Sequence, residues 1–402
     1  MVKLEIRINT MKKLILIIAL LTIINNTQAQ ESTSKLYLSG YVKQLQSVYF
    51  FNDAFPDLQT FMLVDTAFQQ NIFHHRLNAE WVMNESWAVK AGLRTQLFYG
   101  DLVKTNPNYA QQADDGSNDW IKLSTVWLNQ SGFVGHSVLD RLYAEYSKGS
   151  WEVRAGRQRI NWGISTIWNP NDIFNAYSFT DFDYEERPGA DALRIQYYTG
   201  FVGSVELAVR GADKLENSTI AGRWVFNKGN YDMQIIGGYA QKDWVLGGGW
   251  AGNIKNAGWK GEASWFYDPE QKESSLAITS NVDYAFEKGV YLNAGFLYNS
   301  EGTTEGSILN LFTFDISASN LYPYKWTAFL QASYPVTPLL NAGVATIYSP
   351  VKSHALFVNP TLTLSISDNW TLDAVGQIVL DKGNDAYKSS LQVAFLRLKF
   401  SY

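Results

Sequence analysis

Apolar and polar residues alternate with a period of two along most of the chain after residue 35. Near the C-terminus, for example, Trp370 and Leu372 share one parity, whereas Thr371 and Asp373 share the other. This period is that of a β-strand whose two faces meet different surroundings. No apolar stripe with the 3.6-residue period of a helix accompanies it, so the pattern predicts an all-β chain.

Runs of this kind recur about 18 times, with 16 as the alternative count, because strand boundaries read from a sequence are uncertain by a few residues. Their lengths suit the roughly 9–11 residues that a tilted strand needs to cross a membrane. The predicted strands cover residues 35–50, 71–82, 87–100, 137–147, 151–160, 189–198, 202–211, 219–226, 230–241, 244–252, 257–267, 274–286, 289–299, 324–335, 339–349, 354–366, 370–381 and 388–402.

Tight turns and long segments alternate between these strands. The tight turns include Asn84-Glu85 and Asp368-Asn369, and the long segments lie near 51–70, 101–136, 161–188 and 300–323. We therefore predict a transmembrane antiparallel up-and-down β-barrel with long extracellular loops and short periplasmic turns. A soluble β-sandwich or propeller is the alternative. The number of strands and the lack of a repeat of about 40–50 residues argue against both.

The first 29 residues are typical of an N-terminal extension followed by a secretory signal peptide. Lys12 and Lys13 precede the apolar run 14–24, and a small-residue cleavage site ends at Ala29. That run is too short to cross a membrane, because a spanning helix needs about 20 apolar residues. We expect residues 30–402 to form one transmembrane barrel domain, exported to the bacterial outer membrane.

Composition fits a wall between lipid and water. Aromatic residues make up 15% of the 402 residues, yet the mean hydropathy is only −0.17. A net charge of −5 argues against a nucleic-acid partner. The chain has no cysteine, and His74 and His75 fall on opposite parities, so neither thiolates nor this histidine pair can ligate a metal. With no G-x-S-x-G elbow either, we expect no enzyme, no cofactor and no metal site.

The last predicted strand alternates outward apolar residues and ends on an aromatic residue, Tyr402. This resembles the C-terminal assembly signal of bacterial outer-membrane proteins, whose usual last residue is Phe. The resemblance implies that the barrel-assembly machinery recognises this strand and that outer-membrane lipid surrounds the folded barrel.

A second resemblance is carried by residues 154–172. Three short motifs are similar to the G-R-Q, W-G and N-P-x-D signature of uncharacterised porin-like outer-membrane barrels, with a distant likeness to alginate-export barrels. The matching residues are Gly156, Arg157, Gln158, Trp162, Gly163, Asn169, Pro170 and Asp172. Parity places Arg157 toward lipid unless Gly156 forms a bulge. Such a bulge would turn Arg157 toward the base of the following loop, near Asp172.

Charged residues on the polar parity belong to the lumen, because a charge facing the lipid midplane costs about 2–4 kcal/mol. Seven arginines of the second to eighth predicted strands fall into one arc: Arg76, Arg94, Arg141, Arg154, Arg194, Arg210 and Arg223. We expect these arginines to line the pore, to pair with glutamates in a lattice that braces the wall, or to do both.

Residues 161–188 form a long aromatic-rich segment that we expect to fold into the barrel as a constriction loop. Its acidic residues Asp181, Asp183, Glu185 and Glu186 would then oppose the arginine arc across the pore. A solvated extracellular loop is the alternative for these acids, and a calcium site formed by the same carboxylates is another.

Barrels of about 16–18 strands leave an aqueous lumen. We therefore predict a porin-like channel for passive diffusion of small hydrophilic solutes, in which the arginine arc favours anions. The alternative is a non-transport outer-membrane barrel that acts as a surface adhesin or as a structural or export component.

Overall fold

A computed structural model gives the fold of the chain. It describes residues 34–402 except 52–54, 57–62, 65–66, 115–119, 178–182, 184, 306–313, 315 and 383–385. The predicted signal segment therefore lies outside the described residues. Among the described residues, no helix combines the length and the hydropathy that crossing a membrane requires.

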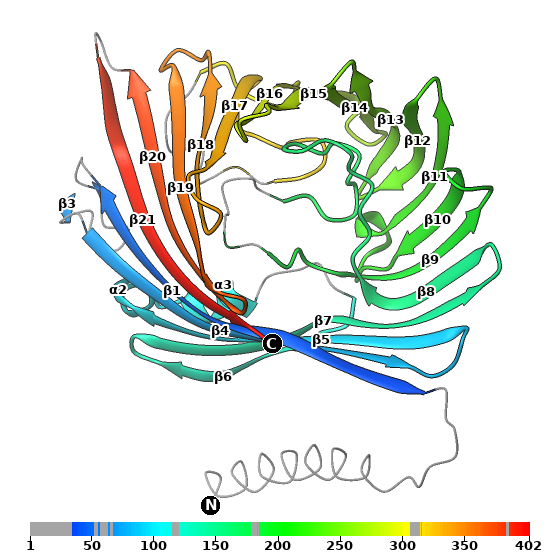
Figure 1. The fold of residues 1–402 in the computed structure, drawn as a ribbon, viewed down its shortest axis with the longest axis horizontal. Helices are drawn as coiled ribbons and strands as arrows, with labels where there is room; N and C mark the ends of the chain where they lie inside the picture. The colour runs from blue at the N-terminus through cyan, green and yellow to red at the C-terminus, as the bar shows by residue number, and fades with distance from the viewer. Residues whose placement is uncertain are drawn as a thin grey trace, which may run out of the picture.

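The described residues form one antiparallel sheet of 19 strands, of which 18 close into a ring (Figure 1). The ring closes because β1 (Lys35–Phe51) pairs with both the next ring strand along the chain, β4 (Ala67–Val82), and the last strand, β21 (Tyr387–Ser401). A closed ring leaves no unpaired strand edge, which is the condition for a sheet to lie in lipid. The predicted up-and-down barrel of about 18 strands is confirmed.

The other ring strands are β5 (Trp87–Gly100), β7 (Phe133–Lys148), β8 (Trp151–Gln158), β9 (Ala190–Tyr198), β10 (Ser204–Arg210), β11 (Thr219–Lys228), β12 (Tyr231–Ala240), β13 (Asp243–Ile254), β14 (Ala257–Asp268), β15 (Glu273–Ala285), β16 (Tyr291–Asn299), β17 (Trp326–Pro335), β18 (Leu340–Ser349), β19 (Ala355–Ser367) and β20 (Trp370–Lys382). A small hairpin pairs β2 (Phe55–Pro56) with β3 (Leu63–Val64).

The connection between β5 and β7 contains elements that the alternation does not predict. These are the short helices α2 (Asp101–Thr105) and α3 (Tyr109–Asp114) and the strand β6 (Ser124–Gln130). The helices pack Val103 and Ala110 against Phe98 and Val134. Strand β6 pairs with residues 133–138 of β7, whereas β8 pairs with residues 142–148 of the same strand. With five and six residues, the helices are too short to produce a periodic stripe in the sequence.

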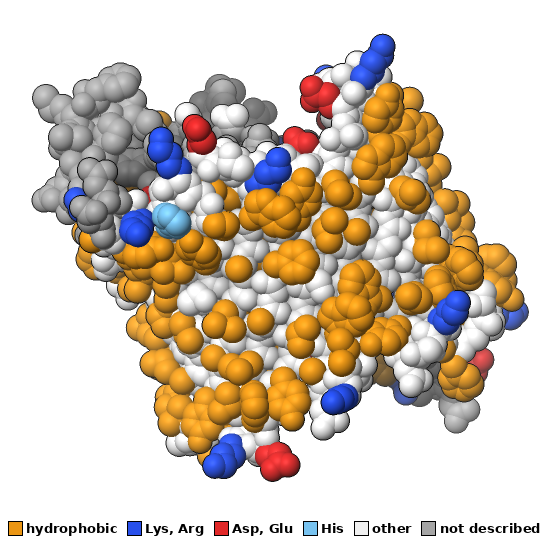
Figure 2. All heavy atoms as spheres, turned by 90° about the horizontal axis from the view of Figure 1, so that it is seen from above, with side chains coloured by type: hydrophobic (Ala, Val, Ile, Leu, Met, Phe, Trp, Pro, Cys, Tyr) orange, Lys and Arg blue, Asp and Glu red, His pale blue; other side chains and the backbone are white. Residues whose placement is uncertain are grey.

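The outer face of the ring is apolar, as the parity of the strands predicts. Figure 2 shows hydrophobic side chains spread over the wall, with Lys, Arg, Asp and Glu gathered toward its two rims. Trp81, Trp87, Trp151 and Trp370 are exposed beside the short turns. Amphipathic aromatic rings at this height suit the boundary between hydrocarbon and headgroups.

The connections at the opposite end are not uniformly long. Residues 159–189 and 300–325 are long, whereas only Gln241 and Lys242 join β12 to β13. The described parts of both long connections run inside the ring (Figure 1). Ile167 and Trp168 of the first pack with Leu321, Tyr322 and Tyr324 of the second in one buried cluster. The lumen is therefore partly filled by protein near the end opposite the short turns. Burial of these apolar and aromatic side chains stabilises the two connections in this position.

Candidate functional site

The connection between β8 and β9, residues 159–189, is called the inner loop here. Its apolar side chains Ile160, Trp162, Ile173 and Phe174 are buried against wall residues that are mostly small, and Trp162 is fully buried. The wall residues in this cluster are Ala190, Ala192, Ala208, Ala221, Ile236, Ala240, Val245 and Phe266. Alanines on the inward parity leave room for the loop to pack close to the wall. The described part of the inner loop thus lies in the lumen, not in bulk solvent.

The motif residues near the middle of the inner loop form a tight turn. The Asp172 amide donates a hydrogen bond of 3.0 Å to the Asn169 carbonyl oxygen, with Pro170 at the second position. Asn and Pro are favoured at the first two positions of such a turn. A Cβ at Gly163 would collide with the Asn169 side chain. Gly163 therefore permits the close approach that brings these two motifs together.

A single buried carboxylate, Glu262 of β14, fastens this turn to the wall. Its Oε1 accepts hydrogen bonds from the amides of Ile164 and Ser165, the latter at 2.5 Å. Its Oε2 accepts one from the Asn171 amide at 3.0 Å. Glu262 is fully buried, so these three donors replace its lost hydration. The sequence places Glu262 on the lumen parity, but nothing in the pattern shows that it binds loop amides.

The motif residues at the end of β8 form a junction in the wall. Gly156 has φ +119°, a value that disfavours other residues. Gln158 donates to the Arg154 and Ala192 carbonyl oxygens. Arg157 is 3% exposed and therefore does not face lipid. The strand register continues through Gly156 without a bulge.

Arg157 bridges three segments besides its own strand. Its Nε lies 2.8 Å from Asp191 of β9, and its Nη2 lies 2.9 Å from the same carboxylate. It also donates to the carbonyl oxygens of Leu139 in β7 and of Ile121 before β6. Among the described residues, Arg157 pairs with the Asp191 carboxylate and not with the Asp172 region suggested by the sequence. This is the place where β7 changes its neighbour from β8 to β6.

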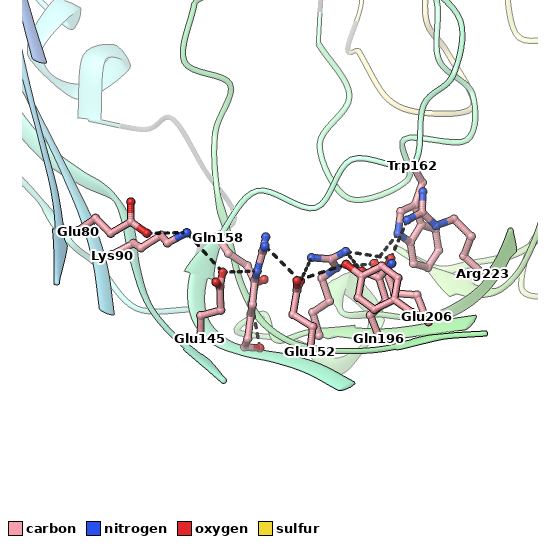
Figure 3. Close-up of polar contacts among 12 residues, drawn as sticks. Glu80, Lys90, Glu145, Glu152, Gln158, Trp162, Gln196, Glu206 and Arg223 are labelled. Atoms are coloured by element: carbon pink, nitrogen blue, oxygen red, sulfur yellow. Dashed lines mark hydrogen bonds and ion pairs between the residues drawn. The ribbon is translucent and has the colours of Figure 1, made fainter. Parts of the chain in front are cut away.

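The seven predicted lumen arginines fall into three groups, not one arc. Arg154, Arg194 and Arg223 belong to a row of alternating charges that begins at Glu80 and Lys90 (Figure 3). Successive ion pairs in this row link Lys90 to Glu145 (3.6 Å), Glu145 to Arg154 (2.8 Å), Arg154 to Glu152 (3.1 Å), Glu152 to Arg194 (3.0 Å), Arg194 to Glu206 (2.7 Å) and Glu206 to Arg223 (2.7 Å). The Trp162 indole donates to Glu206 at 2.8 Å and so joins the inner loop to the row. These three arginines have the geometry of the wall-bracing lattice.

Arg76, Arg94 and Arg141 form the second group, on β4, β5 and β7. Arg76 is 2% exposed and pairs with Asp140 and, at 3.4 Å, with Glu186 of the inner loop. The parity of β7 predicts opposite faces for Asp140 and Arg141. Parity therefore does not identify Asp140 as a lumen residue. The register of β5 and β7 shifts at this point, and such a bulge redirects side chains. Arg210, the third group, donates to the Phe174 carbonyl oxygen at 3.4 Å.

The acidic residues near the end of the inner loop contact the wall directly. Asp183 lies 2.7 Å from Lys43 and 3.2 Å from Arg397, and Glu185 lies 2.8 Å from Arg397 and 3.2 Å from Lys399. With the contact between Glu186 and Arg76, these pairs tie the loop to β1, β21 and β4. Asp181 lies outside the described residues. Asp183, Glu185 and Glu186 are therefore paired with cations of the wall and do not face arginines across open space.

Lys43 was not among the predicted site residues, although it lies on the lumen parity of the first strand. It is 1% exposed and pairs with Asp183 of the inner loop. Among the described residues, no group of three His, Asp or Glu side chains is placed to hold a metal ion.

One buried acid makes the loop sensitive to pH. Burial, opposed by Arg159 and reinforced by Glu262, raises the pKa of the Asp172 carboxyl to about 7. The ordinary value is about 4, so the folded protein favours the protonated acid. This contribution to stability is complete below about pH 4 and is lost as the pH rises to about 7.

We expect Asp172→Asn to remove this part of the pH dependence. Relative to the unsubstituted protein, the variant should gain thermal stability between about pH 4 and pH 8, because its amide cannot ionise. Unfolding temperatures in detergent micelles at several pH values measure the difference. A difference that stays constant across this range would contradict the prediction.

No family model and no curated protein matches the chain. Solved structures match it in fold. OccK11 (OpdR) of Pseudomonas aeruginosa aligns over 91% of this chain and 96% of its own, with a TM-score of 0.54 and 8% identity. OccK8 (OprE) of the same organism covers 90% and 98% (TM-score 0.53, 10% identity), and OccAB1 of Acinetobacter baumannii covers 93% and 99% (TM-score 0.52, 10% identity). At such identities the similarity concerns the fold alone, and that fold is the porin-like barrel predicted from the sequence.

Proposed function

We propose that the chain is an outer-membrane channel for passive diffusion of small hydrophilic solutes. The observation that carries this function is the closed ring of 18 strands, apolar outside and charged inside. Eight strands would be filled by side chains, whereas about 16–18 leave room for water. We assign the lumen that this ring encloses to solute passage and not to catalysis.

The inner loop, whose residues 161–188 were predicted to narrow the pore, is the proposed constriction. Glu262 fastens its first half to β14, and Asp183 and Glu185 fasten its second half to β1 and β21. The described parts of these two halves are therefore fastened to strands on different sides of the ring. Two hollows remain beside the loop. The first, of about 290 Å³, is lined by Arg76, Lys90 and Arg141 with Glu80 and Glu186, and the second, of about 60 Å³, by Arg94 and Arg157 with Asp114 and Asp140. Arg94 and Arg141, which form no ion pair among the described residues, support a preference for anions.

Strand β21 is the part of the barrel that we assign to recognition by the barrel-assembly machinery. Leu396, Leu398 and Tyr402 are exposed on the outer face. The backbone of Tyr402 exchanges two hydrogen bonds of 3.0 Å with Gly40, next to the seam where the ring closes. Before the ring closes, such a strand can present its apolar side chains to a partner protein. After assembly, outer-membrane lipid surrounds these side chains.

Planar-bilayer recording with the purified chain tests the proposed function. We expect discrete conductance steps. Under a KCl gradient, we expect a reversal potential whose sign shows that chloride is more permeant than potassium. Absence of steps from protein shown to be folded and inserted would overturn the channel and favour the adhesin or structural alternative. A reversal potential whose sign shows that potassium is more permeant would refute the anion preference but would not contradict the proposed channel.

A further inference from the structure

The pairing of β1 with β21 joins the first and the last ring strand and forms the seam of the barrel. Every other pair of neighbouring ring strands is consecutive among the ring strands, whereas residues 52–386 separate β1 from β21. In a hairpin the turn fixes the register of the two strands. No turn joins the two strands of the seam, so another feature has to fix the register in which the ring closes.

Strand pairing alone does not select the observed register. Strand β1 pairs with β21 over residues 41–51, whereas residues 35–39 pair only with β4 among the described strands and continue past the C-terminus (Figure 1). A slip of β21 by two residues toward Lys35 would give more of these residues a partner. Every side chain would keep its face after such a slip, because the strand period is two. The apolar parity therefore excludes a slip by one residue but not a slip by two.

The side chain of Tyr402 crosses β1 on the outer face and reaches β4. Its Oη lies 2.9 Å from Nε2 of His75 and donates a hydrogen bond of 3.2 Å to the Arg76 carbonyl oxygen. A hydroxyl has one proton, so Oη is then free to accept a hydrogen bond from Nε2–H of His75. The Tyr402 and His75 rings are stacked, with 6.3 Å between their centroids. The last residue of the chain thus contacts the second ring strand across the first.

The crossing takes place over Gly40, with which the Tyr402 backbone exchanges its two hydrogen bonds. A Cβ on Gly40 would lie 2.7 Å from the Tyr402 Oη and would also collide with the Arg76 carbonyl oxygen. Gly40 is the only glycine of β1, and the outward residues two positions away are Leu38 and Val42. After a slip by two residues, one of these larger side chains would stand in the path of the Tyr402 ring.

We propose that Tyr402 and Gly40 fix the register in which the barrel closes. In the observed register the ring passes over a glycine and the hydroxyl meets both of its partners on β4. After a slip by two residues, a leucine or valine side chain blocks the ring and the hydroxyl loses both partners. Phenylalanine at this position would supply the ring without the hydroxyl. This role in closure is separate from the proposed recognition of β21 and does not depend on solute passage.

Disulfide trapping during refolding of the chain into lipid vesicles tests the register. The chain has no cysteine, so a pair of cysteines introduced across the seam reports a single register. Val48→Cys with Ala394→Cys reports the observed register, because these residues lie opposite each other. Val48→Cys with Gln392→Cys reports the slip by two residues. A disulfide needs Cβ atoms about 3.5–4.5 Å apart, which opposite residues satisfy and residues displaced by two do not.

Both cysteine pairs are also introduced into Tyr402→Ala, which removes the ring and its hydroxyl. The trapped fraction of the slipped pair should rise about tenfold, because each lost hydrogen bond shifts an equilibrium by about two- to tenfold. Tyr387→Ala is the control, since Tyr387 lies at the other end of β21 and pairs with β20. The slipped fraction should not change in the control. An equal slipped fraction with and without the Tyr402 side chain would overturn the proposal.

Tyr402→Phe tests the hydroxyl by itself and still applies if Tyr402→Ala does not insert into the vesicles. Unfolding of the inserted barrel in urea should be about fivefold faster, because two hydrogen bonds of the closed ring are lost. In the His75→Leu background the same substitution should accelerate unfolding only about twofold, because the bond to the Arg76 carbonyl oxygen alone remains to be lost. An unchanged unfolding rate in Tyr402→Phe would overturn the role assigned to the hydroxyl.

Discussion

Replacing Glu262 with alanine is expected to release the inner loop from β14 and to raise the single-channel conductance. The Glu262 carboxylate is the acceptor for the buried amides of Ile164, Ser165 and Asn171. A buried donor left without an acceptor costs about 1–3 kcal/mol. With three such donors, the docked position loses most of its advantage, and the loop should spend more time away from the wall.

Conductance and its fluctuations in planar bilayers measure this effect. Asp283→Ala is the matched control, because Asp283 lies on the same face of the neighbouring strand β15 and makes no hydrogen bond with the described part of the inner loop. We expect the control to conduct like the unsubstituted chain. Equal conductance in Glu262→Ala and the control would show that Glu262 does not hold the loop in the pore.

The predicted strands agree with the structure because two physical conditions act on every strand. Lipid requires one apolar face, and closure of the ring requires pairing along both edges. Both conditions leave local marks in the sequence. For this reason the segments predicted near 87–100 and 370–381 correspond to β5 (Trp87–Gly100) and β20 (Trp370–Lys382) within one residue.

The pairing of charges could not be predicted in the same way. Asp140 reaches Arg76 only because the register shifts between β5 and β7, and a bulge changes the parity on which the prediction depends. Lys43 and Asp183 are 140 residues apart and meet only when the loop crosses the barrel. On undistorted strands, parity indicates which side of the wall a charge occupies, but it does not indicate which other charge it meets.

The division of the arginines changes what selectivity can depend on. Arg154, Arg194 and Arg223 are neutralised by glutamates in the row of Figure 3 and contribute little net field. Arg94 and Arg141 have no carboxylate partner among the described residues. Any preference for anions therefore depends on this smaller set. The arc predicted from the sequence is too large because it counted braced and unbraced arginines alike.

Replacing Arg157 with methionine is expected to give the largest loss of stability. Methionine keeps an unbranched apolar stem but leaves the Asp191 charge buried without a cation, with only the backbone amides of Ile121 (2.9 Å) and Trp120 as donors. Breaking a buried ion pair by removing one partner costs about 3–5 kcal/mol. The junction of β7, β8 and β9 should therefore open. Urea unfolding of the barrel in lipid vesicles measures the free energy of unfolding.

The double variant Arg157→Met/Asp191→Asn distinguishes an unpaired charge from a general packing defect. Asparagine keeps an oxygen for the Ile121 amide and carries no charge, so the double variant should recover much of the stability that Arg157→Met loses.

Arg154→Met, three residues earlier on β8, is the control. Its side chain is 24% exposed, and its partners Glu145 and Glu152 keep ion pairs with Lys90 and Arg194, so its removal leaves no acid without a cation and should cost less stability. A loss of stability in Arg154→Met as large as that in Arg157→Met would contradict the assignment of Arg157 as the fastening of the junction. A double variant less stable than Arg157→Met alone would show that the stranded charge is not the cause.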